Sequence, residues 1–434
     1  MTLMNDLIEL ISMGPFGSDI KVDNFISDGV PVLNGLNVSS IKLIETSFKY
    51  VSHEKSKALK KANAKRGDIV ITHRGTVGQI SYIPENSKYD NYVISQSQFR
   101  VSLKRDLVDP IFFTYYFHTD EGQKRLLSFK SHVGVPALAQ ATTNFRLLEF
   151  PLIHLEEQKK IAKVLSDLDA KIELNNKIND NLEQLAKTLY DYWFVQFDFP
   201  DANGKPYKIS GGKMVWNAEL NREIPVGWEV KKTEEIVYDI KTGLNPREHF
   251  KLGGGLNYYI TIKNIEYGRI SFNNSCDRID DEAMERIQKR SNLEKGDILF
   301  TSIEPVGKTY LLSEKPINWN INESVFSFKP NYDLVSSEYL FMLLSSKVFN
   351  DLCKNASTGS IHKGIRITPM KAFKNCYPNN KILIDEFTKI VSPYLKLIDK
   401  NQKENQELAS LRDWLLPMLM NGQVSVGGVE IKKG

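Results

Sequence analysis

Residues 155–194 constrain the fold most, because they have the apolar spacing of one long helix. The acidic pair Glu156–Glu157 suits the positively polarised amino end of a helix. Apolar residues then recur at steps of three and four, the spacing of a helix with one partner-facing side. No Gly or Pro interrupts the stretch before Pro200. About 40 residues at 1.5 Å each would make a rod of roughly 60 Å, too long for an ordinary core helix. The predicted seam of this rod is Ile161, Leu165, Leu168, Ile172, Leu182, Leu185 and Leu189.

A second stretch repeats the pattern about 229 residues later, an offset far longer than a solenoid repeat. The polar break at Asn175–Asn176 falls on Glu404–Asn405, and the first-turn Glu157 falls on Glu386. Two unrelated surface helices would not be expected to share these interruptions. The predicted seam of the second rod is Ile390, Tyr394, Leu397, Leu408, Leu411 and Leu415.

The chain therefore reads as two copies of a globular domain followed by a rod. Two helices with matching interruptions would pair best antiparallel, which gives a pseudo-twofold internal repeat. We expect a mixed α/β fold in which the two domains are separated by the two paired helices. The expected parts are domain 1 at 1–150, a rod at 151–196, a linker at 197–222, domain 2 at 223–380, a rod at 381–422 and a tail at 423–434.

Each domain is predicted to combine short strands with helices. In domain 1 we expect strands at 30–35, 68–72 and 79–83, and helices at 52–65 and 110–129. The segment Arg66-Gly-Asp-Ile-Val-Ile-Thr72 returns in domain 2 as Lys295-Gly-Asp-Ile-Leu-Phe-Thr301, and the aromatic helix returns at 339–349. Between such anchors the two halves differ almost completely. A shared scaffold with divergent loops suggests two related binding domains that read different things.

Composition limits the possible partners and compartments. The net charge is only +4, so any basic surface must be local. Three cysteines without metal-ligand spacing fit a reducing cytoplasm and give no disulfide framework. No apolar run approaches the roughly 18 residues of a membrane span, and no signal peptide opens the chain. We therefore expect a cytoplasmic protein with no membrane partner and no metal.

Basic residues recur in both halves at the same offset. Positions i, i+3 and i+4 share one face of a helix, so each domain would present a cationic patch that could neutralise phosphates. The alternative is a solvated helix face, but the recurrence favours phosphate contact. The candidates are Lys57, Lys60, Lys61 and Arg66 in domain 1, and Arg286, Lys289, Arg290 and Lys295 in domain 2.

The Gly-containing loops ahead of each rod are a second group of candidates for DNA contact. Their cationic side chains beside close-approach glycines could reach phosphates or base edges, although an ordinary surface turn fits equally well. The candidates are Lys130 and His132 in the first half and His362, Lys363 and Arg366 in the second; Asn245, Arg247 and His249, with Ser18, Asp19 and Lys21, are weaker ones.

Catalytic signatures are missing from the sequence. There is no phosphate-binding G-x-x-x-x-G-K-[ST] loop, no H-E-x-x-H pair and no amino-methyltransferase motif, and Gly253–Gly255 opens no βα unit. Pro200–Asp201 resembles the start of a nuclease motif, but no acidic-x-Lys follows at a useful distance. We therefore expect no catalytic residue on this chain.

The chain resembles the specificity (S) subunits of type I restriction-modification systems. Each motif alone is weak, but the ordered and duplicated set is strong. The motifs are Gly14-Pro-Phe-Gly-Ser18, the two R/K-G-D strands followed by Val-Gly, Pro151–Gln158 opening the rod, Leu189–Phe194 with Phe197-Asp-Phe199 closing it, and Glu223–Trp228 beginning domain 2.

The resemblance implies two target recognition domains, each reading half of a bipartite sequence in double-stranded DNA. It also implies that the two conserved helices set the unread spacer and dock two modification subunits, joined by restriction subunits. S-adenosylmethionine, ATP and Mg would then belong to those partners, with no cofactor on this chain. The alternatives are a self-sufficient DNA methyltransferase and a coiled-coil scaffold that does not bind nucleic acid.

Two features depart from a perfect repeat. The segment Pro225-Val-Gly-Trp228 has no counterpart ahead of Met1, and the tail at 424–433 is a candidate to supply it, since the family is described as circularly arranged. Pro417 stands where the first rod has Thr188. We expect it to kink the second rod or to end it sooner, because proline removes a helix N–H.

Overall fold

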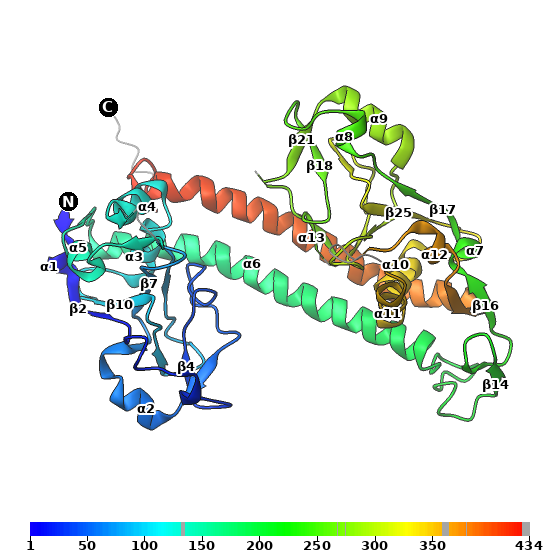
Figure 1. The fold of residues 1–434 in the computed structure, drawn as a ribbon, viewed down its shortest axis with the longest axis horizontal. Helices are drawn as coiled ribbons and strands as arrows, with labels where there is room; N and C mark the ends of the chain where they lie inside the picture. The colour runs from blue at the N-terminus through cyan, green and yellow to red at the C-terminus, as the bar shows by residue number, and fades with distance from the viewer. Residues whose placement is uncertain (132–134, 267, 274, 358–363, 379, 428–434) are drawn as a thin grey trace. The chain divides into compact units, whose positions relative to one another are not determined.

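The computed structural model describes residues 1–131, 135–266, 268–273, 275–357, 364–378 and 380–427. It divides into two compact units, of which unit 1 is Met1–Glu173 with Gln406–Gly434 and unit 2 is Leu174–Asn405. Each unit holds one globular domain and a segment of each long helix (Figure 1).

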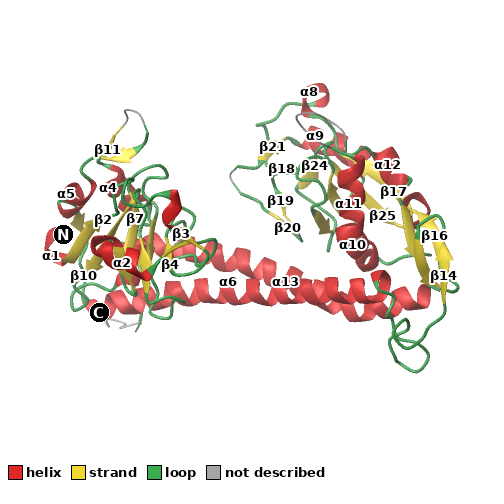
Figure 2. Ribbon diagram, turned by 60° about the horizontal axis from the view of Figure 1, so that its bottom comes forward, coloured by secondary structure: helices red, strands yellow, loops and turns green. Residues whose placement is uncertain are grey.

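The two long helices are α6, Leu155–Tyr190, and α13, Lys381–Met420. A single π-helical turn, Asp191–Val195, follows α6. Within unit 2 the helices pair antiparallel, because Asn176 bonds Asn405 while Asn179, further along α6, bonds the earlier Asn401. Figure 2 shows the two helices side by side. The predicted mixed α/β fold with two long paired helices is confirmed.

A buried cluster of amides forms the contact between the helices in unit 2. The Asn175 amide donates to Glu404 at 2.8 Å and to the Asn405 side-chain oxygen at 2.9 Å. Asn401 donates to Asn179 at 2.9 Å. The side chains of Asn175, Asn179 and Asn401 are at most 6% exposed. The polar break in the sequence is therefore a set of hydrogen bonds inside the helix pair, and we call it the amide cluster.

The apolar seam differs from the predicted one. Ile161 and Leu165 are buried, but Leu185, Leu397 and Leu411 are 54%, 41% and 43% exposed, and Ile390 is 39% exposed. Buried amides occupy part of the contact between the helices. The other predicted seam residues are partly buried: Leu168, Ile172, Leu182, Leu189, Tyr394, Leu408 and Leu415.

Pro417 does not end the second helix early. The helix runs through it to Met420, because Leu416, Leu419 and Met420 are buried in the core of unit 1 and hold the last turn in place. Of the tail, Val426 packs against the same core, whereas residues 428–433 lie outside the described residues.

Domain 1 is built on two sheets. The first is antiparallel, with strand order β2-β10-β7-β8, and α3 and α4 contribute to its core. The second has the order β3-β5-β4-β9-β6. The strands are β2 Ile8–Met13, β10 Gln98–Leu103, β7 Ile69–Thr72 and β8 Ile80–Tyr82, then β3 Phe25–Ile26, β5 Lys49–Val51, β4 Val30–Val32, β9 Asn91–Val93 and β6 Asn63–Lys65.

Domain 2 repeats the first sheet with the same pairing. Its order is β17-β25-β22-β23, beside a three-stranded sheet β21-β18-β24 in which β18 and β24 are parallel. The strands are β17 Val237–Thr242, β25 Val325–Pro330, β22 Ile298–Thr301 and β23 Thr309–Leu311, then β21 Asp277–Ile279, β18 Asn257–Ile260 and β24 Trp319–Ile321.

A short strand pair joins the start of each domain to its end. In domain 1 this is β1 Thr2–Leu3 with β13 Glu149–Phe150, and in domain 2 it is β16 Glu229–Lys232 with β26 Lys374–Tyr377. The hairpins are β11 Lys130–Ser131 with β12 Ala137–Leu138, β14 Met214–Asn217 with β15 Arg222–Pro225, and β19 Ile265–Glu266 with β20 Arg269–Ile270. Short helices are α1 Met4–Leu7, α5 Ala141–Arg146, α7 Thr233–Ile236, α8 Pro246–His249, α9 Asp281–Ser291 and α12 Ile367–Lys371.

The repeated Gly-Asp motif holds a buried ion pair in each domain. Asp68 accepts from Arg100 of β10 at 3.0 Å, and Asp297 accepts from Lys329 of β25 at 2.7 Å. The carboxylates also accept the backbone N–H groups of Lys65 and Glu294 and thereby close the turn before β7 and β22. Losing one partner of such a pair would leave an uncompensated buried charge. The motif therefore serves the core of each domain.

Two predicted helices are shorter than expected. The segment 52–65 forms α2, His53–Ala58, and a 3-10 turn at Lys60–Ala62, because the Asn63 amide bonds the carbonyls of Ser56 and Leu59. The segment 110–129 forms α3 Pro110–Tyr116 and α4 Asp120–Leu127, where the hydroxyl of Thr119 caps the second helix. Domain 2 has the same break between α10 Ser337–Ser345 and α11 Lys347–Ala356.

The domains contact the long helices differently in the two units. In unit 1, Asp169 accepts from Arg412 at 2.6 Å and from the Tyr115 hydroxyl at 2.5 Å, and Lys42 pairs with Glu173. Burial and the bond to Asp169 raise the pKa of Tyr115, so this hydroxyl remains a donor. In unit 2 a cavity of about 450 Å³ lies at the junction of domain 2 with α13; its lining includes Glu183, Lys295, Tyr310, Ser392, Asp399 and Gln402.

Candidate nucleic-acid interface

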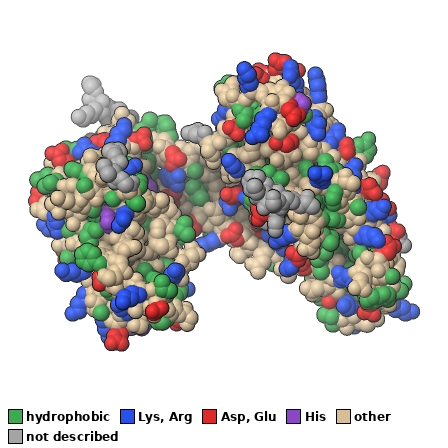
Figure 3. Space-filling model, in the orientation of Figure 1, with side chains coloured by type: hydrophobic (Ala, Val, Ile, Leu, Met, Phe, Trp, Pro, Cys, Tyr) green, Lys and Arg blue, Asp and Glu red, His purple; other side chains and the backbone are tan. Residues whose placement is uncertain are grey.

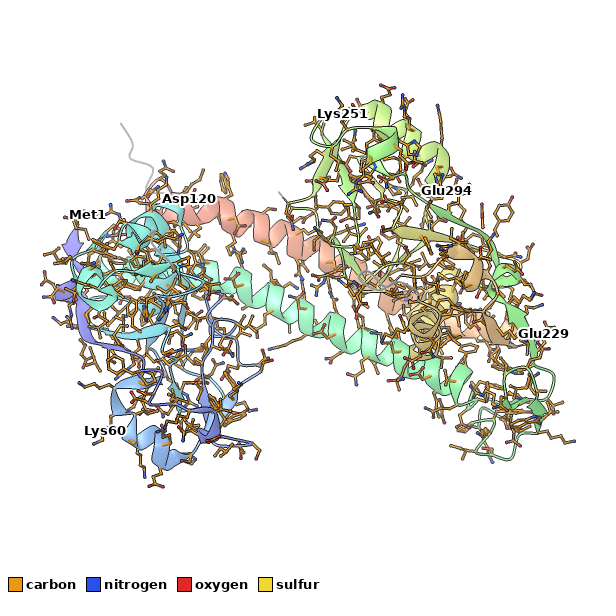
Figure 4. The ribbon with its side chains drawn as sticks, viewed as in Figure 1. Met1, Lys60, Asp120, Glu229, Lys251 and Glu294 are labelled. Carbon is orange, nitrogen blue, oxygen red and sulfur yellow. The ribbon has the colours of Figure 1, made fainter. Side chains whose placement is uncertain are left out.

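The cationic residues predicted for domain 1 lie on two consecutive turns. Lys57 is on α2, whereas Lys60 and Lys61 are on the 3-10 turn after it, and all three are exposed. Lys60 is labelled in Figure 4. Among the described residues none forms an ion pair with these three side chains. Arg66 is different, because it bonds the Ser87 carbonyl at 2.8 Å and pairs with Asp90 at 3.0 Å. Three cations, here called the lysine patch, are therefore available to a phosphate backbone.

The corresponding residues of domain 2 do not form one patch. On α9, Arg286 pairs with Glu282 at 2.6 Å and bonds the His249 carbonyl. Arg290 bonds the Thr242 hydroxyl at 3.2 Å. Lys289 is exposed, while Lys295 lines the cavity next to α13. Figure 3 likewise shows Lys and Arg interspersed with Asp and Glu over the visible face.

The two Gly-containing loops meet the same part of the sheet in both domains. In domain 1 the carbonyls of His73 and Pro136 bond the N–H groups of Leu138 and Gly75, which joins the loop to the turn after β7. In domain 2 the Ile365 N–H bonds the Ser302 carbonyl in the turn after β22. Lys130 and Arg366 are exposed beside these contacts, whereas His132, His362 and Lys363 lie outside the described residues.

A third segment completes this surface, namely the turn before β10 in domain 1 and before β25 in domain 2. In domain 1 the N–H of His73 bonds the Ser97 carbonyl at 2.9 Å, and its ring lies 3.2 Å from the Gln96 carbonyl. Burial lowers the pKa of His73, so the ring is neutral at pH 7. The side chains of Arg74 and Gln96 are exposed. A Cβ on Gly17 would lie 2.6 Å from the Gln96 side-chain oxygen, so the loop that begins at Gly14 also reaches this point. We call the surface formed by His73, Arg74, Gln96 and the adjoining loops corner 1.

Domain 2 has the equivalent surface, corner 2, and here it is a groove of about 920 Å³. The Ser302 N–H bonds the Ser324 carbonyl at 2.9 Å, as His73 bonds Ser97 in domain 1. Glu323 and Arg247 both line the groove, and the Tyr259 hydroxyl lies 3.4 Å from the Glu323 carboxylate. Lys251, labelled in Figure 4, belongs to the same lining. Both corners thus combine a cation with a side chain that accepts hydrogen bonds.

Sequence reasoning placed Arg247 among its weaker candidates and missed Arg74, Gln96 and Glu323. A signal for them exists. The paired segments Thr72–Gly78 and Thr301–Gly307 keep their ends and differ between them, as expected for a variable turn on a fixed strand. The turn before β10 or β25 carries no such motif. Only the pairing of these strands with β7 and β22 shows that Gln96 and Glu323 lie beside the variable turn.

Other kinds of site are not evident in the described residues. In the ranges given above, no group of three or more His, Cys, Asp or Glu side chains could hold a metal ion. No helix there is long and apolar enough to cross a membrane. Cys276, Cys353 and Cys376 are free thiols, and burial raises the pKa of Cys353 and of Cys376 to about 12, so these two are not activated nucleophiles.

Comparison with known families assigns the class of the protein. A family model described as the type I restriction modification DNA specificity domain matches residues 29–184 and 225–410. The chain belongs to this family and is a specificity subunit of a type I restriction-modification system, not catalytic by itself. The resemblance seen in the sequence is thereby confirmed.

Individual relatives agree with this assignment. The chain is 27% identical over 369 residues to the MjaIX specificity subunit of Methanocaldococcus jannaschii, covering 83% of this chain and 78% of that protein. It is 24% identical over 411 residues to the HindI specificity subunit of Haemophilus influenzae, covering 83% and 87%. Its fold is similar to the crystal structure of the S subunit from M. genitalium, with a TM-score of 0.58, 17% identity and coverage of 96% and 95%.

The lysine patch generates a first prediction. Replacing Lys57, Lys60 and Lys61 with Ala should weaken all duplexes similarly, because phosphate contacts carry no sequence information. The slope of log K against log salt should fall by about one unit per lost contact. The measurement is a salt titration of duplex binding by the assembled complex.

The matched control removes the same charge elsewhere, by replacing Lys205, Lys208 and Lys213 of the linker with Ala. All three are exposed, and this variant should keep the wild-type slope. A patch variant that lost discrimination between target and non-target at an unchanged slope would identify these lysines as base readers and refute phosphate contact.

Proposed function

We propose that this subunit reads a bipartite sequence in double-stranded DNA, with each domain reading one half. The observation that carries the proposal is the recurrence of one surface, corner 1 and corner 2, at the same place on two copies of one sheet. The scaffolds agree down to the Asp68–Arg100 and Asp297–Lys329 pairs, while the exposed side chains differ. Two copies of one reader with different contact residues suit a target made of two different halves.

The paired helices are proposed to set the unread spacer between the half-sites. Each is one uninterrupted helix, of 36 residues for α6 and 40 for α13. The amide cluster supports the idea, because a shift of register would leave buried amides without partners, and polar residues inside helix pairs specify register in this way. The helices would then act as a ruler of fixed length.

Exposed apolar side chains on the long helices are proposed to dock two modification subunits. Unit 2 exposes Leu185, Ile390 and Leu397, and unit 1 exposes Leu411 and Trp414. Leu185 and Trp414, 54% and 57% exposed, occupy equivalent positions in the repeat. Exposed apolar residues of this size mark interaction sites when they cluster. Two equivalent sites fit two copies of one partner.

The catalytic steps of modification and restriction are then proposed to belong to the partner subunits. The complex is proposed to act in the cytoplasm. The modification subunits would bring S-adenosylmethionine, and restriction subunits would bring ATP and Mg. This chain would take no cofactor of its own. It would contribute position and sequence choice to the complex.

Exchange of domains tests the bipartite reading. Replacing residues 1–150 with the corresponding domain of another specificity subunit should change only one half of the methylated motif. The measurement is the set of methylated motifs in DNA from cells that carry the exchanged complex. Exchange of 223–380 is the matched control and should change only the other half. New bases in both halves after a single exchange would rule out independent readers.

Single substitutions test the docking sites. Leu185→Asp and Trp414→Asp should each remove one modification subunit, because a carboxylate would have to be buried in an apolar interface. Native mass spectrometry of the co-purified complex should therefore show one copy in place of two, and none for the double variant. Leu147→Asp, at a 61% exposed position away from the long helices, is the control. Two bound copies in the double variant would disprove these sites.

Insertion into both helices tests the ruler. Four residues after Asn176 and four after Glu404 leave the Asn176–Asn405 bond on one side of the insertions and the Asn179–Asn401 bond on the other. Each helix lengthens by about 6 Å, which is about two base pairs at 3.4 Å each. We expect the spacer to grow by one or two base pairs while both half-sites keep their bases.

The control carries the insertion in α6 alone, which misaligns the pair and should reduce assembly. An unchanged spacer in a fully assembled double-insertion complex would show that the helices do not measure distance. The readout is again the methylated motif.

A further inference from the structure

We infer that Glu323 and Gln96 are equivalent base-reading residues, and that their difference gives the two half-sites different bases. Glu323 would accept a hydrogen bond from the exocyclic amine of a cytosine. Gln96 would bind an adenine with two hydrogen bonds, one through its amide oxygen and one through its amide NH2 group. The inference rests on the proposed bipartite reading and names the residues that perform it.

Position is the first support. In each domain the residue that directly follows β7 or β22 donates its main-chain N–H to a serine carbonyl. His73 donates to Ser97 in domain 1, and Ser302 donates to Ser324 in domain 2. Gln96 and Glu323 immediately precede those serines and so hold the same place on the scaffold. Both stand in the turn ahead of the central strand, β10 or β25, where the Gly-containing loop also converges. Two residues at one structural position can perform one task with different chemistry.

The turns do not need these two side chains for their own structure. In domain 1 the Gln98 side chain accepts the Ser95 N–H, and the Gln98 N–H bonds the Ser95 carbonyl. In domain 2 the Asn322 side chain accepts the Ser324 N–H at 3.1 Å. Neighbouring residues therefore shape each turn. The ends of Gln96 and Glu323 remain available to a ligand.

Charge decides what Glu323 can contact. A carboxylate in a DNA-facing groove is repelled by phosphates, so it does not serve the backbone. The base edges offer it donors, and in the major groove the amine of cytosine is the usual partner of Glu. The Tyr259 hydroxyl donates to the Leu244 carbonyl at 2.7 Å and lies 3.4 Å from the Glu323 carboxylate. Glu323 is thus suited to reading a base amine.

An arginine accompanies each reader. Arg247 lines the groove with Glu323, and Arg74 follows His73 in corner 1, where its main-chain N–H lies 3.4 Å from the Ser97 carbonyl and its side chain is exposed. Arginine binds the acceptor edge of guanine with two hydrogen bonds, and glutamine binds adenine similarly. The geometry therefore favours a guanine in both half-sites, with a cytosine in the half read by domain 2 and an adenine in the half read by domain 1.

The test is Glu323→Gln in the full complex with its modification subunits. The amide gains a donor and loses the charge, so the preferred base at one position of one half-site should change from cytosine to adenine. Equilibrium binding to duplexes carrying each base at each position measures this. We expect the cytosine preference, about 5- to 150-fold for one good contact, to be lost or reversed at that position only.

Two further variants complete the design. Gln96→Glu should make the reciprocal change, from adenine to cytosine, in the other half. Gly17→Ala should weaken the adenine preference without lowering the melting temperature, since its Cβ displaces only the flexible end of Gln96. Glu285→Gln, the same substitution at an exposed position of α9, is the control and should keep every preference.

Two results would overturn the inference: unchanged preferences at every position in Glu323→Gln, or changes spread over both halves. If Glu323→Gln melts below the wild type, Glu323→Asp, which keeps the charge and shortens the side chain, decides in its place. It should weaken discrimination at the same single position, and unchanged preferences would again refute the inference. A wild-type complex without any bipartite preference would refute the proposed function instead, so the two failures are distinguishable.

Discussion

Hydrogen bonds between buried amides are the interaction on which the paired helices depend. An apolar seam tolerates sliding, because one leucine contact resembles the next. An amide does not, because a buried donor or acceptor left without its partner costs about 1–3 kcal/mol. Asn175, Asn179 and Asn401 are nearly inaccessible to solvent, so a shift of register would break the bonds they make. The Asn175 side-chain oxygen has no hydrogen-bond partner in the observed register within the part of the chain that the structure describes. The helix pair exchanges some apolar burial for a defined alignment, and the proposed ruler requires that alignment.

In the proposed function, the two domains divide their residues between stability and recognition. Both domains have the Gly-Asp turn with a buried cation, Arg100 in domain 1 and Lys329 in domain 2, and both bury an aromatic helix in the core. The turns at the sheet edge are different and lie at the surface. The separation also explains why the predicted cationic patches are unequal, because Arg66, Arg286 and Arg290 turned out to bond the protein itself. A repeated charge in a sequence can serve folding as well as binding.

Much of the architecture followed from the sequence, since heptad-like spacing and an internal repeat are strong signals. The long helices, their pairing and the duplicated sheet motif were predicted from them. The helix breaks were not, because they depend on caps such as Thr119 and Asn63 that act through tertiary placement. The corners could not be predicted either, since Gln96 and Glu323 meet their neighbours only through strand pairing. Positions that are equivalent in the repeat can also have different roles. Arg412 bonds Asp169 in unit 1, while the matching Glu183 borders a cavity in unit 2.

The turns that carry the proposed readers are held by main-chain bonds and by neighbouring side chains, as in the pairs His73–Ser97 and Ser302–Ser324. The bonds that hold these turns are therefore made without the side chains of Gln96 and Glu323. Gln96 is exposed and Glu323 is half-buried; substitutions at exposed positions usually change stability by less than about 0.5 kcal/mol. New sequence preferences can then arise by single substitutions, and a host can alter which DNA it marks as its own without first acquiring a compensating mutation elsewhere in the chain.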